Sequence, residues 1–177
     1  NGNKENLKFV LEVSKILKLK KDYLIKTLKK FKGLKYRQEI IFQSKNLTII
    51  NDSKATTFSS SVSLLKSLTN VYWIVGGQAK KGDKLLLSKN DCENFNAYIF
   101  GNNKNFFIGK LKKIMKYKYF LDLKSLVKKL SLEIKIDKKN IHKTILFSPA
   151  AASFDSFKNF EKRGEYFNQL IKKYINV

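Results

Sequence analysis

Cysteine is almost absent from this sequence. Cys92 is the single cysteine among 177 residues, so no internal disulfide can form. Apolar stretches such as residues 71–75 are far shorter than the roughly 20 residues that span a bilayer, and the first residues show no pattern typical of a signal peptide. These absences exclude a disulfide-stapled scaffold and a helical membrane protein, and they favour a protein of the reducing cytoplasm. We separately expect a monomer.

Arginine and acidic residues are also scarce. Arg37 and Arg163 are the only arginines among 37 basic residues, and with 14 acidic residues the formal net charge is +23. Such a charge predicts an anionic partner, but proteins that read nucleic acid rely on the bidentate guanidinium group, which lysine lacks. The lysines are also spread over nearly every segment, as a codon bias toward A and T would produce. We therefore expect no nucleic-acid or membrane partner, although a basic surface attracts phosphorylated substrates.

Two amphipathic segments open the chain. Apolar residues recur at three- and four-residue spacing from Asn3 to Leu17, which predicts a helix. A second helix is expected from Lys21 to Phe31, with Phe31 on its buried stripe and Gly33 placed just past its end. The two helices are expected to form a hairpin that is too small to fold alone.

Beyond Gly33, short apolar runs alternate with helical ones. The expected strands are 39–42, 47–50, 71–75, 97–100, 119–121 and 144–147. The expected helices are 57–68, 103–115, 123–130 and 155–174. This order predicts an α/β fold with an open, Rossmann-like, mostly parallel sheet and helices on both faces. Ligands of such sheets bind at the carboxyl ends of the strands, so the loops that follow strands are the candidate sites.

The first candidate loop is Asn51-Asp-Ser-Lys-Ala-Thr56, between an apolar strand and a helix. A carboxylate there can hold a ribose hydroxyl, while a lysine and the free N–H groups of a helix start suit phosphate or carboxylate oxygens. The same residues also suit an ordinary helix cap, with Asp52 or Ser53 bonding the first turn. The residues alone leave both interpretations open.

The second candidate loop is Gly76-Gly-Gln-Ala-Lys-Lys-Gly-Asp83, directly after the strand 71–75. Paired glycines let the backbone approach a ligand closely, and Lys80 or Lys81 supplies a compact positive charge beside it. The loop is not a Walker A loop, because no Gly-x-x-x-x-Gly-Lys precedes a Ser or Thr. By itself, this loop is weak evidence for a ligand site.

The third candidate loop is Ser148-Pro-Ala-Ala-Ala-Ser153, which is expected to end where Ser153 or Asp155 begins a long helix. The alanines leave room at the helix N-terminus, where free N–H groups and the helix dipole favour a carboxylate. Ser153 offers a further hydrogen bond, and Phe154 and Phe160 are placed to form walls. The remaining apolar residues of this helix are expected to face the core.

In this order, the loops 51–56 and 148–153 and the run Phe157-Lys-Asn-Phe-Glu-Lys-Arg-Gly164 resemble the last domain of the Mur ligase family, in the branch that adds D-glutamate. Other branches are expected to carry Asp-Tyr-Ala-His where this chain has Asp52-Ser-Lys-Ala55. The resemblance covers essentially the whole chain. It implies an ATP-dependent, amide-bond-forming ligase of peptidoglycan precursor synthesis. In this family ATP phosphorylates the terminal carboxylate of UDP-N-acetylmuramoyl-L-alanine, and the amine of D-glutamate attacks the acyl phosphate.

The resemblance also implies roles for individual residues. The positions expected to hold D-glutamate are Thr56, Lys80, Ser153, Phe154 and Phe160. The positions expected to contact ATP are Asn3, Asn6, Arg37, Asp52 and Lys54. Tyr36 and Thr57 depart from the family, which usually has His and Asn there.

The resemblance assigns residues 1–33 to the end of the central ATP-binding domain and residues 34–177 to the amino-acid-binding domain. The phosphate loop and the metal-binding acid of a complete ligase are not visible in this sequence. We therefore expect the Mg²⁺ ligands upstream, and we expect no metal site in this chain. The chain is then expected to begin partway through a protein and to be inactive alone. Two alternatives stay open: a basic nucleic-acid-binding protein, and a stand-alone α/β module that binds a nucleotide or an acidic amino acid.

Overall fold

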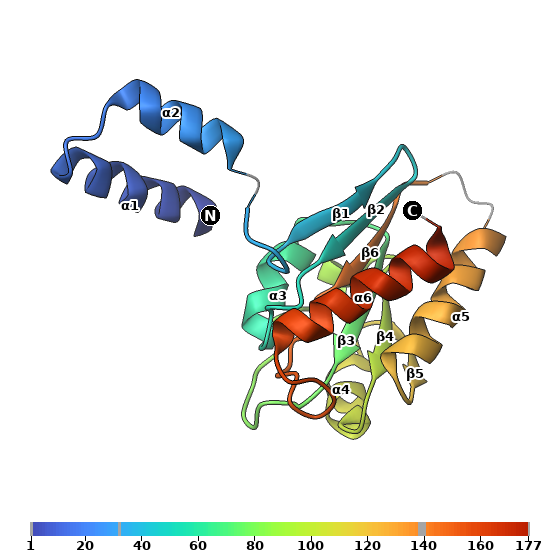
Figure 1. Cartoon of the computed structure of the whole chain (residues 1–177). Coiled ribbons are helices and arrows are strands. Elements are labelled where there is room, and N and C mark those ends of the chain that lie inside the picture. The colour runs from blue at the N-terminus through green and yellow to red at the C-terminus, as the bar shows by residue number, and fades with distance from the viewer. Residues whose placement is uncertain (1, 32, 138–140, 177) are drawn as a thin grey trace. The chain divides into compact units, whose positions relative to one another are not determined.

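The computed structural model describes residues 2–31, 33–137 and 141–176, and the chain divides into two compact units, residues 1–33 and 34–177. The first unit contains α1 (Gly2–Ile16) and α2 (Lys21–Lys30), close to the bounds expected (Figure 1). The expectation of a buried stripe on α2 is wrong: the helix buries no residue, and Phe31 is 64% exposed. Two short helices offer too little surface to cover such a stripe.

The second unit is built on a six-stranded sheet with the order β1-β2-β6-β3-β4-β5. Only β1 runs antiparallel, to β2, and the four other pairings are parallel. The strands are β1 (Glu39–Gln43), β2 (Leu47–Asn51), β3 (Val71–Gly76), β4 (Asn96–Phe100), β5 (Lys116–Phe120) and β6 (Lys143–Phe147). An α/β fold with a mostly parallel sheet is therefore confirmed.

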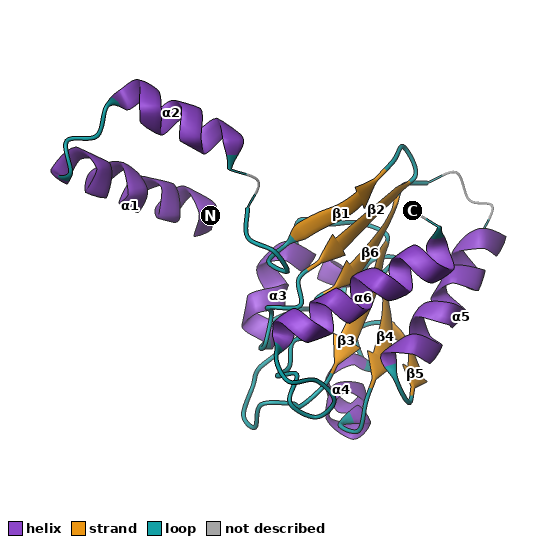
Figure 2. Cartoon of the chain, in the orientation of Figure 1, coloured by secondary structure: helices purple, strands orange, loops and turns teal. Residues whose placement is uncertain are grey.

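Helices cover both faces of this sheet (Figures 1 and 2). One face carries α3 (Phe58–Leu65) and α4 (Lys104–Leu111), and the other carries α5 (Leu123–Ile136) and α6 (Phe160–Ile175). A short 3₁₀ helix, η1 (Asn90–Cys92), lies between β3 and β4.

Strand alternation divides the buried side chains between two cores. Along β3, Trp73 and Val75 pack under α3 and α4, whereas Ile74 packs under α5 and α6. Neighbouring side chains of a strand point to opposite faces, so one apolar run serves both cores. This explains why the central strands are apolar at nearly every position instead of at every second one.

Several boundaries differ from those expected: α3 ends at Leu65 and not at 68, α4 ends at Leu111 and not at 115, and α5 continues to Ile136 beyond 130. The last helix begins at Phe160 and not near Asp155, because the side chain of Asn159 caps it by accepting a hydrogen bond from Lys162 N at 2.8 Å. The expected helix N-terminus beside the alanines is therefore wrong. The fifth strand begins at Lys116 and ends at Phe120, and Leu121, expected inside it, is 71% exposed.

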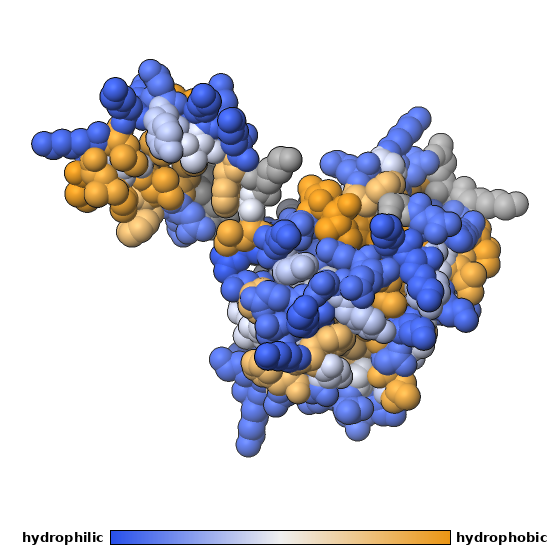
Figure 3. Space-filling model, in the orientation of Figure 1, coloured by the Kyte–Doolittle hydropathy of each residue, from blue (hydrophilic) through white to orange (hydrophobic). Residues whose placement is uncertain are grey.

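The surface of the second unit is strongly polar. Figure 3 shows hydrophilic side chains over most of the face that it presents, in agreement with the dispersal of lysine along the sequence. None of the helices in residues 2–31, 33–137 and 141–176 is both long enough and apolar enough to cross a membrane.

Gly76, at the carboxyl end of β3, can be tested against a second glycine. Gly76 has φ +145°, and a Cβ there would lie 2.9 Å from Phe100 N, whereas Gly109 in α4 has open space around it and helical φ. We expect Gly76→Ala to lower the free energy of unfolding by about 2 kcal/mol or more. Gly109→Ala should raise it by about 0.5 to 1 kcal/mol.

Urea unfolding of the two variants and the parent measures both effects. A Gly76→Ala protein as stable as the parent would contradict the close approach of β3 and β4.

Candidate functional site

The three candidate loops lie at one edge of the sheet. They follow β2, β6 and β3, which are neighbours and run parallel, so their carboxyl ends meet (Figure 1). β6 enters the sheet between β2 and β3, so the chain order reverses at this point. Crevices at such a reversal are where open α/β sheets bind ligands.

Backbone hydrogen bonds fasten the loop after β3 to the loop after β6. Gly76 N donates to Pro149 O at 3.0 Å, and Gln78 and Ala152 exchange two bonds, at 2.9 and 3.0 Å. Gly77, with φ +124°, lies so close that a Cβ on it would be 2.7 Å from Ala152 O. The paired glycines thus allow the loop after β3 to lie close to the loop after β6, and the alanine turn packs against them.

Asp52 is buried at the start of the loop after β2, with 3% of its surface exposed. Its Oδ1 accepts a hydrogen bond from Gln38 N at 3.1 Å, and its Oδ2 accepts one from Ser148 Oγ at 2.8 Å. Burial raises the pKa of Asp52 to about 6, and the bonds from Ser148 and Gln38 and the charge of Arg37 only partly offset it. Asp52 therefore titrates near neutral pH.

Ser148 joins this carboxyl group to the sheet. Its hydroxyl lies 2.7 Å from Ser61 Oγ on α3, and its carbonyl accepts a hydrogen bond from Trp73 Nε1 at 2.8 Å. Because Ser148 Oγ donates to Asp52, the hydroxyl of Ser61 is the donor to Ser148. The loops after β2 and β6 are thus linked by a buried polar chain.

Arg163 is fully buried in the first turns of α6. Its Nε donates to Ser53 Oγ at 3.1 Å and its Nη2 donates to Ser53 O at 2.7 Å. Burial lowers the pKa of Arg163 to about 10, and the nearby carboxylate of Asp155 raises it, so the guanidinium stays charged at neutral pH. This two-point contact fixes the loop after β2 against α6, where a lysine would offer a single point charge.

The outer side of the same guanidinium faces the glycine loop. A Cβ at Gly77 would lie 3.1 Å from Arg163 Nη1, and one at Gly101 would lie 3.2 Å from Asp155 Oδ2. Neither Nη1 nor Oδ2 has a hydrogen-bond partner among the residues described here. Arg163 therefore bonds to Ser53 of the loop after β2 and lies beside Gly77 of the loop after β3.

Lys54 and Phe160 lie together at the surface of the site. Lys54 Nζ is 4.2 Å from the centre of the Phe160 ring, and Lys54 N donates to Tyr36 O at 3.0 Å. The ring of Tyr36 packs on Gly164, where a Cβ would lie 2.7 Å from Tyr36 Cγ. Gly164 thus leaves room for the segment that carries Tyr36 and Arg37.

The residues expected to hold D-glutamate differ in accessibility. Lys80, Thr56 and Phe154 are exposed, Phe160 is half-buried, and Ser153 is 3% exposed. The carbonyl of Ser153 accepts hydrogen bonds from Ser156 N and Phe157 N at 3.2 and 2.8 Å. Ser153 therefore belongs to a tight turn of its own before α6, and not to the first turn of the helix.

The residues expected to contact ATP belong to both units of the chain. Arg37 and Lys54 are exposed near the loop after β2, with Asp52 buried beside them. Asn6 is exposed on α1, in the first unit, and the side chain of Asn3 lies outside the described residues. Thr57 caps α3, since its Oγ1 accepts from Ser60 N at 3.4 Å.

Sequence reasoning gave no role to two residues that build this site. The sequence assigns Arg163 no site role, although an arginine is rare in this lysine-rich chain and that rarity is a usable signal. Asp83 was read only as the end of a glycine loop, yet its Oδ2 accepts a hydrogen bond from Phe58 N at 2.7 Å and ties that loop to α3. In the described part of the chain, no three His, Cys, Asp or Glu residues gather as metal ligands.

The raised pKa of Asp52 predicts a pH dependence of stability. Between about pH 4 and pH 6 the folded state keeps a proton on Asp52 that the unfolded state has lost. The contribution of Asp52 to the free energy of unfolding is therefore most favourable at low pH, and it is lost as the pH rises to about 6. Asp52→Asn removes the buried charge, and its amide can donate to Ser148 where the carboxylate accepted. We expect the variant to gain about 2 to 3 kcal/mol relative to the parent at pH 7.5 and little at pH 4.

Urea unfolding at the two pH values measures this gain. Asp91→Asn is the control of opposite sign, because hydrogen bonds from Ser88 lower the pKa of Asp91. An Asp52→Asn gain that is equal at both pH values would contradict the burial of a titrating carboxyl group.

Comparison with known proteins gives clear relatives, although no protein-family model matches the chain. The UDP-N-acetylmuramoylalanine–D-glutamate ligase of Wolbachia sp. subsp. Brugia malayi is 37% identical over 172 residues, covering 97% of this chain and 34% of the relative. The enzyme of the same name from Francisella tularensis is 35% identical over 173 residues, covering 96% and 40%. The chain thus spans between a third and two fifths of the length of these relatives.

A solved structure shares the fold. The MurF ligase of Thermotoga maritima, crystallised with ADP, superposes with a TM-score of 0.56 at 18% identity, covering 94% of this chain and 36% of that one. The chain is therefore homologous to about the C-terminal third of UDP-N-acetylmuramoylalanine–D-glutamate ligases, and it belongs to the Mur ligase family.

Proposed function

We propose that this chain supplies the D-glutamate-binding part, and a share of the ATP-binding part, of a ligase that joins D-glutamate to UDP-N-acetylmuramoyl-L-alanine. The observation that carries the proposal is the meeting of three loops at the reversal in strand order, in a chain whose relatives bear that enzyme's name. The proposed ligase is ATP-dependent, needs Mg²⁺, and acts as a monomer in the cytoplasm.

The glutamate site is proposed around the loops after β3 and β6. Lys80 is an exposed cation that suits one carboxylate, and the turn after Ser148 is lined by small side chains beside Ser153 and Phe160. Thr56 and Phe154 are exposed and available at the rim. D-glutamate carries two carboxylates and one ammonium group, so exposed cations at this edge favour it over an amino acid without a side-chain charge.

The nucleotide contacts are proposed around the loop after β2. Arg37 and Lys54 are exposed cations and suit phosphate oxygens. Asp52 fits a ribose contact less well, because both its oxygens already accept hydrogen bonds within the protein. The ATP proposal therefore rests on the two cations, together with Asn3 and Asn6 of the first unit.

Residues 1–33 are proposed to belong to the ATP-binding domain of the complete ligase, and residues 34–177 to be the amino-acid-binding domain. Apolar side chains support this division, since Phe9 and Ile16 on α1 are 73% and 79% exposed and would be covered in a larger domain. Without that domain, the chain is proposed to be inactive. The Mg²⁺ ligands are proposed to lie outside this chain.

In the proposed reaction, ATP supplies the phosphoryl group that turns the substrate carboxylate into a reactive acyl phosphate. This chain's part is to hold the amine of D-glutamate within reach of that carbon and to orient it. The exposed cations Arg37 and Lys54 would lower the charge repulsion between phosphate and amino acid.

A chimeric ligase tests the proposal. Residues 1–177 replace the matching third of the Francisella tularensis enzyme, and phosphate release from ATP is measured with UDP-N-acetylmuramoyl-L-alanine and D-glutamate. An exposed ion pair is worth up to about 1 kcal/mol and a desolvated one about 2 kcal/mol or more. We therefore expect Lys80→Ala in the active chimera to raise the KM for D-glutamate by roughly 5- to 30-fold.

Lys81→Ala is the matched control, because it removes the neighbouring exposed charge, and its KM should change less than about twofold. Equal effects of the two substitutions would reject a specific role for Lys80. A chimera that folds, as judged by urea unfolding, but does not use D-glutamate would reject the function.

A further inference from the structure

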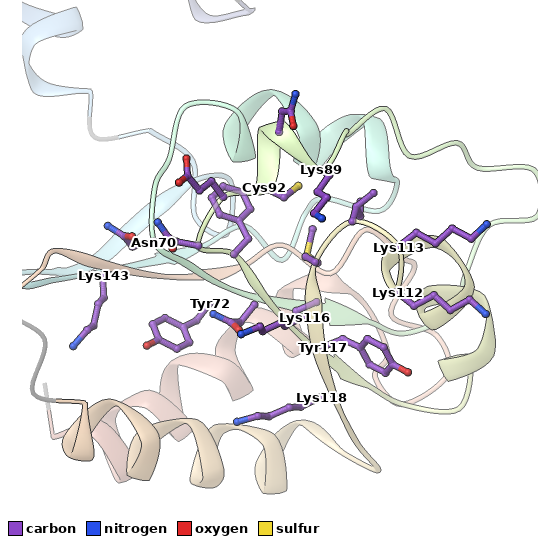
Figure 4. A pocket seen from close by; sticks show the side chains of 18 of the residues that line it. Asn70, Tyr72, Lys89, Cys92, Lys112, Lys113, Lys116, Tyr117, Lys118 and Lys143 are labelled. Carbon is purple, nitrogen blue, oxygen red and sulfur yellow. The ribbon is translucent and has the colours of Figure 1, made fainter.

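A second hollow lies at the opposite edge of the sheet, away from the three candidate loops. Its lining includes the amino-terminal ends of the four strands β3 to β6, at Tyr72, Asn96, Lys116 and Lys143 (Figure 4). Its volume is about 1370 Å³, above the range of roughly 300 to 1,000 Å³ that is usual for small-molecule sites. The proposed ligase function leaves this hollow without a role.

Positive charge dominates the lining. Its six lysines are Lys89, Lys112, Lys113, Lys116, Lys118 and Lys143, whereas its only described carboxylates are Glu93 and Asp137. Asp137 is already engaged, with Lys143 Nζ at 3.1 Å and the hydroxyl of Tyr72 at 3.2 Å. The hollow therefore carries net positive charge beyond what its own acids offset.

Two lysines of the lining are paired and four are not. Lys118 pairs with Glu133 of α5 at 2.7 Å, and Lys143 with Asp137. For the other four, no carboxylate of the described residues lies within 4 Å. Figure 4 shows Lys89 directed into the hollow and Lys116 on its floor, while Lys112 and Lys113 extend away at the rim. Like charges held on one concave surface repel one another, and a bound anion relieves that repulsion.

The remaining lining residues suit a ligand with more than one kind of surface. Ile141, which is 43% exposed, provides apolar surface, and Asn96 adds an amide. Tyr117 of the edge strand β5 is 41% exposed beside the lysines. No arginine lines the hollow in the described part of the chain, so its cations are compact charges on flexible arms that impose no planar geometry.

We propose that this hollow binds a multivalent phosphate anion, either an inorganic polyphosphate chain or the phosphate groups of a nucleotide. Several spaced negative charges are needed, because one carboxylate or one phosphate cannot meet lysines spread across a hollow of this size. Flexible ammonium groups tolerate a phosphate chain in several positions, and the exposed side chains of Ile141 and Tyr117 offer a surface for a ring at its end. This site is independent of the proposed ligase site at the carboxyl edge.

Calorimetric titration of the 177-residue chain with inorganic tripolyphosphate at about 0.15 M salt tests the proposal. The hollow variant is Lys89→Gln with Lys116→Gln. The matched control is Lys124→Gln with Lys172→Gln, which removes equal charge from exposed positions on α5 and α6 outside the lining. We expect the hollow variant to bind tripolyphosphate at least about tenfold more weakly than the parent, and the control less than about twofold.

A third variant separates the two edges of the sheet. Arg37→Gln with Lys54→Gln removes two cations that also suit phosphate oxygens, so it should weaken tripolyphosphate binding, but far less than the hollow variant does, because the hollow is proposed as the tighter site. Titration with ATP distinguishes the two sources of phosphate: tighter binding than tripolyphosphate, lost in the hollow variant, indicates a nucleotide, and equal binding indicates the phosphate chain alone.

Three results would overturn the proposal. One is equal weakening by the hollow and control variants, which would mean that general surface charge attracts the anion. Another is loss of binding in the variant at the carboxyl edge. The last is binding of single-stranded oligonucleotides without binding of tripolyphosphate, which would indicate a nucleic-acid surface instead.

Discussion

The contact between Arg163 and Ser53 is the constraint on which the candidate site depends. A fully buried guanidinium must satisfy its donors inside the protein, because leaving a buried charge without partners is costly. Here two of its nitrogens bond to one serine of the loop after β2, while its third side lies against Gly77. The position of α6 thereby determines the position of two loops that are far apart in the sequence.

The surrounding architecture explains why this contact is possible. Inserting β6 between β2 and β3 brings Ser148 beside Asp52 and Ala152 beside Gln78, so the loops are linked by side chains on one side and by backbone on the other. The glycines at 76, 77 and 164 admit a neighbouring backbone or ring where a methyl group would not fit. The proposed binding residues Lys80 and Lys54 then project from linked loops, as a preorganised site requires.

Much of the fold follows from local pattern. Apolar runs and helical spacing predicted all six strands and the helices between them, because the central strands face two cores and are apolar throughout. The start of α6 could not be predicted this way. Ser153, Asp155 and Asn159 are all capable caps, and no local pattern distinguishes Asn159, whose side chain accepts the hydrogen bond from Lys162 N.

The sequence predicts which residues lie in the candidate site, but it does not predict the burial or the charges around each of them. The sequence located Asp52 in a loop after a strand, but its raised pKa results from burial by β6, which lies almost a hundred residues away. The charged hollow is a similar case. Its lysines are dispersed along the chain, and the sheet gathers the amino ends of four strands around one space.

The central claim is that the carboxyl edge of this sheet is a site for D-glutamate. The most direct measurement is an amide NMR titration of the chain with D-glutamate and, separately, with L-glutamate. The account predicts saturable shifts for Gly77, Lys80 and Ser153, larger with the D enantiomer, and none at Asn96 on the opposite edge. Shifts that are equal for both enantiomers, or that are absent from these loops, would contradict it.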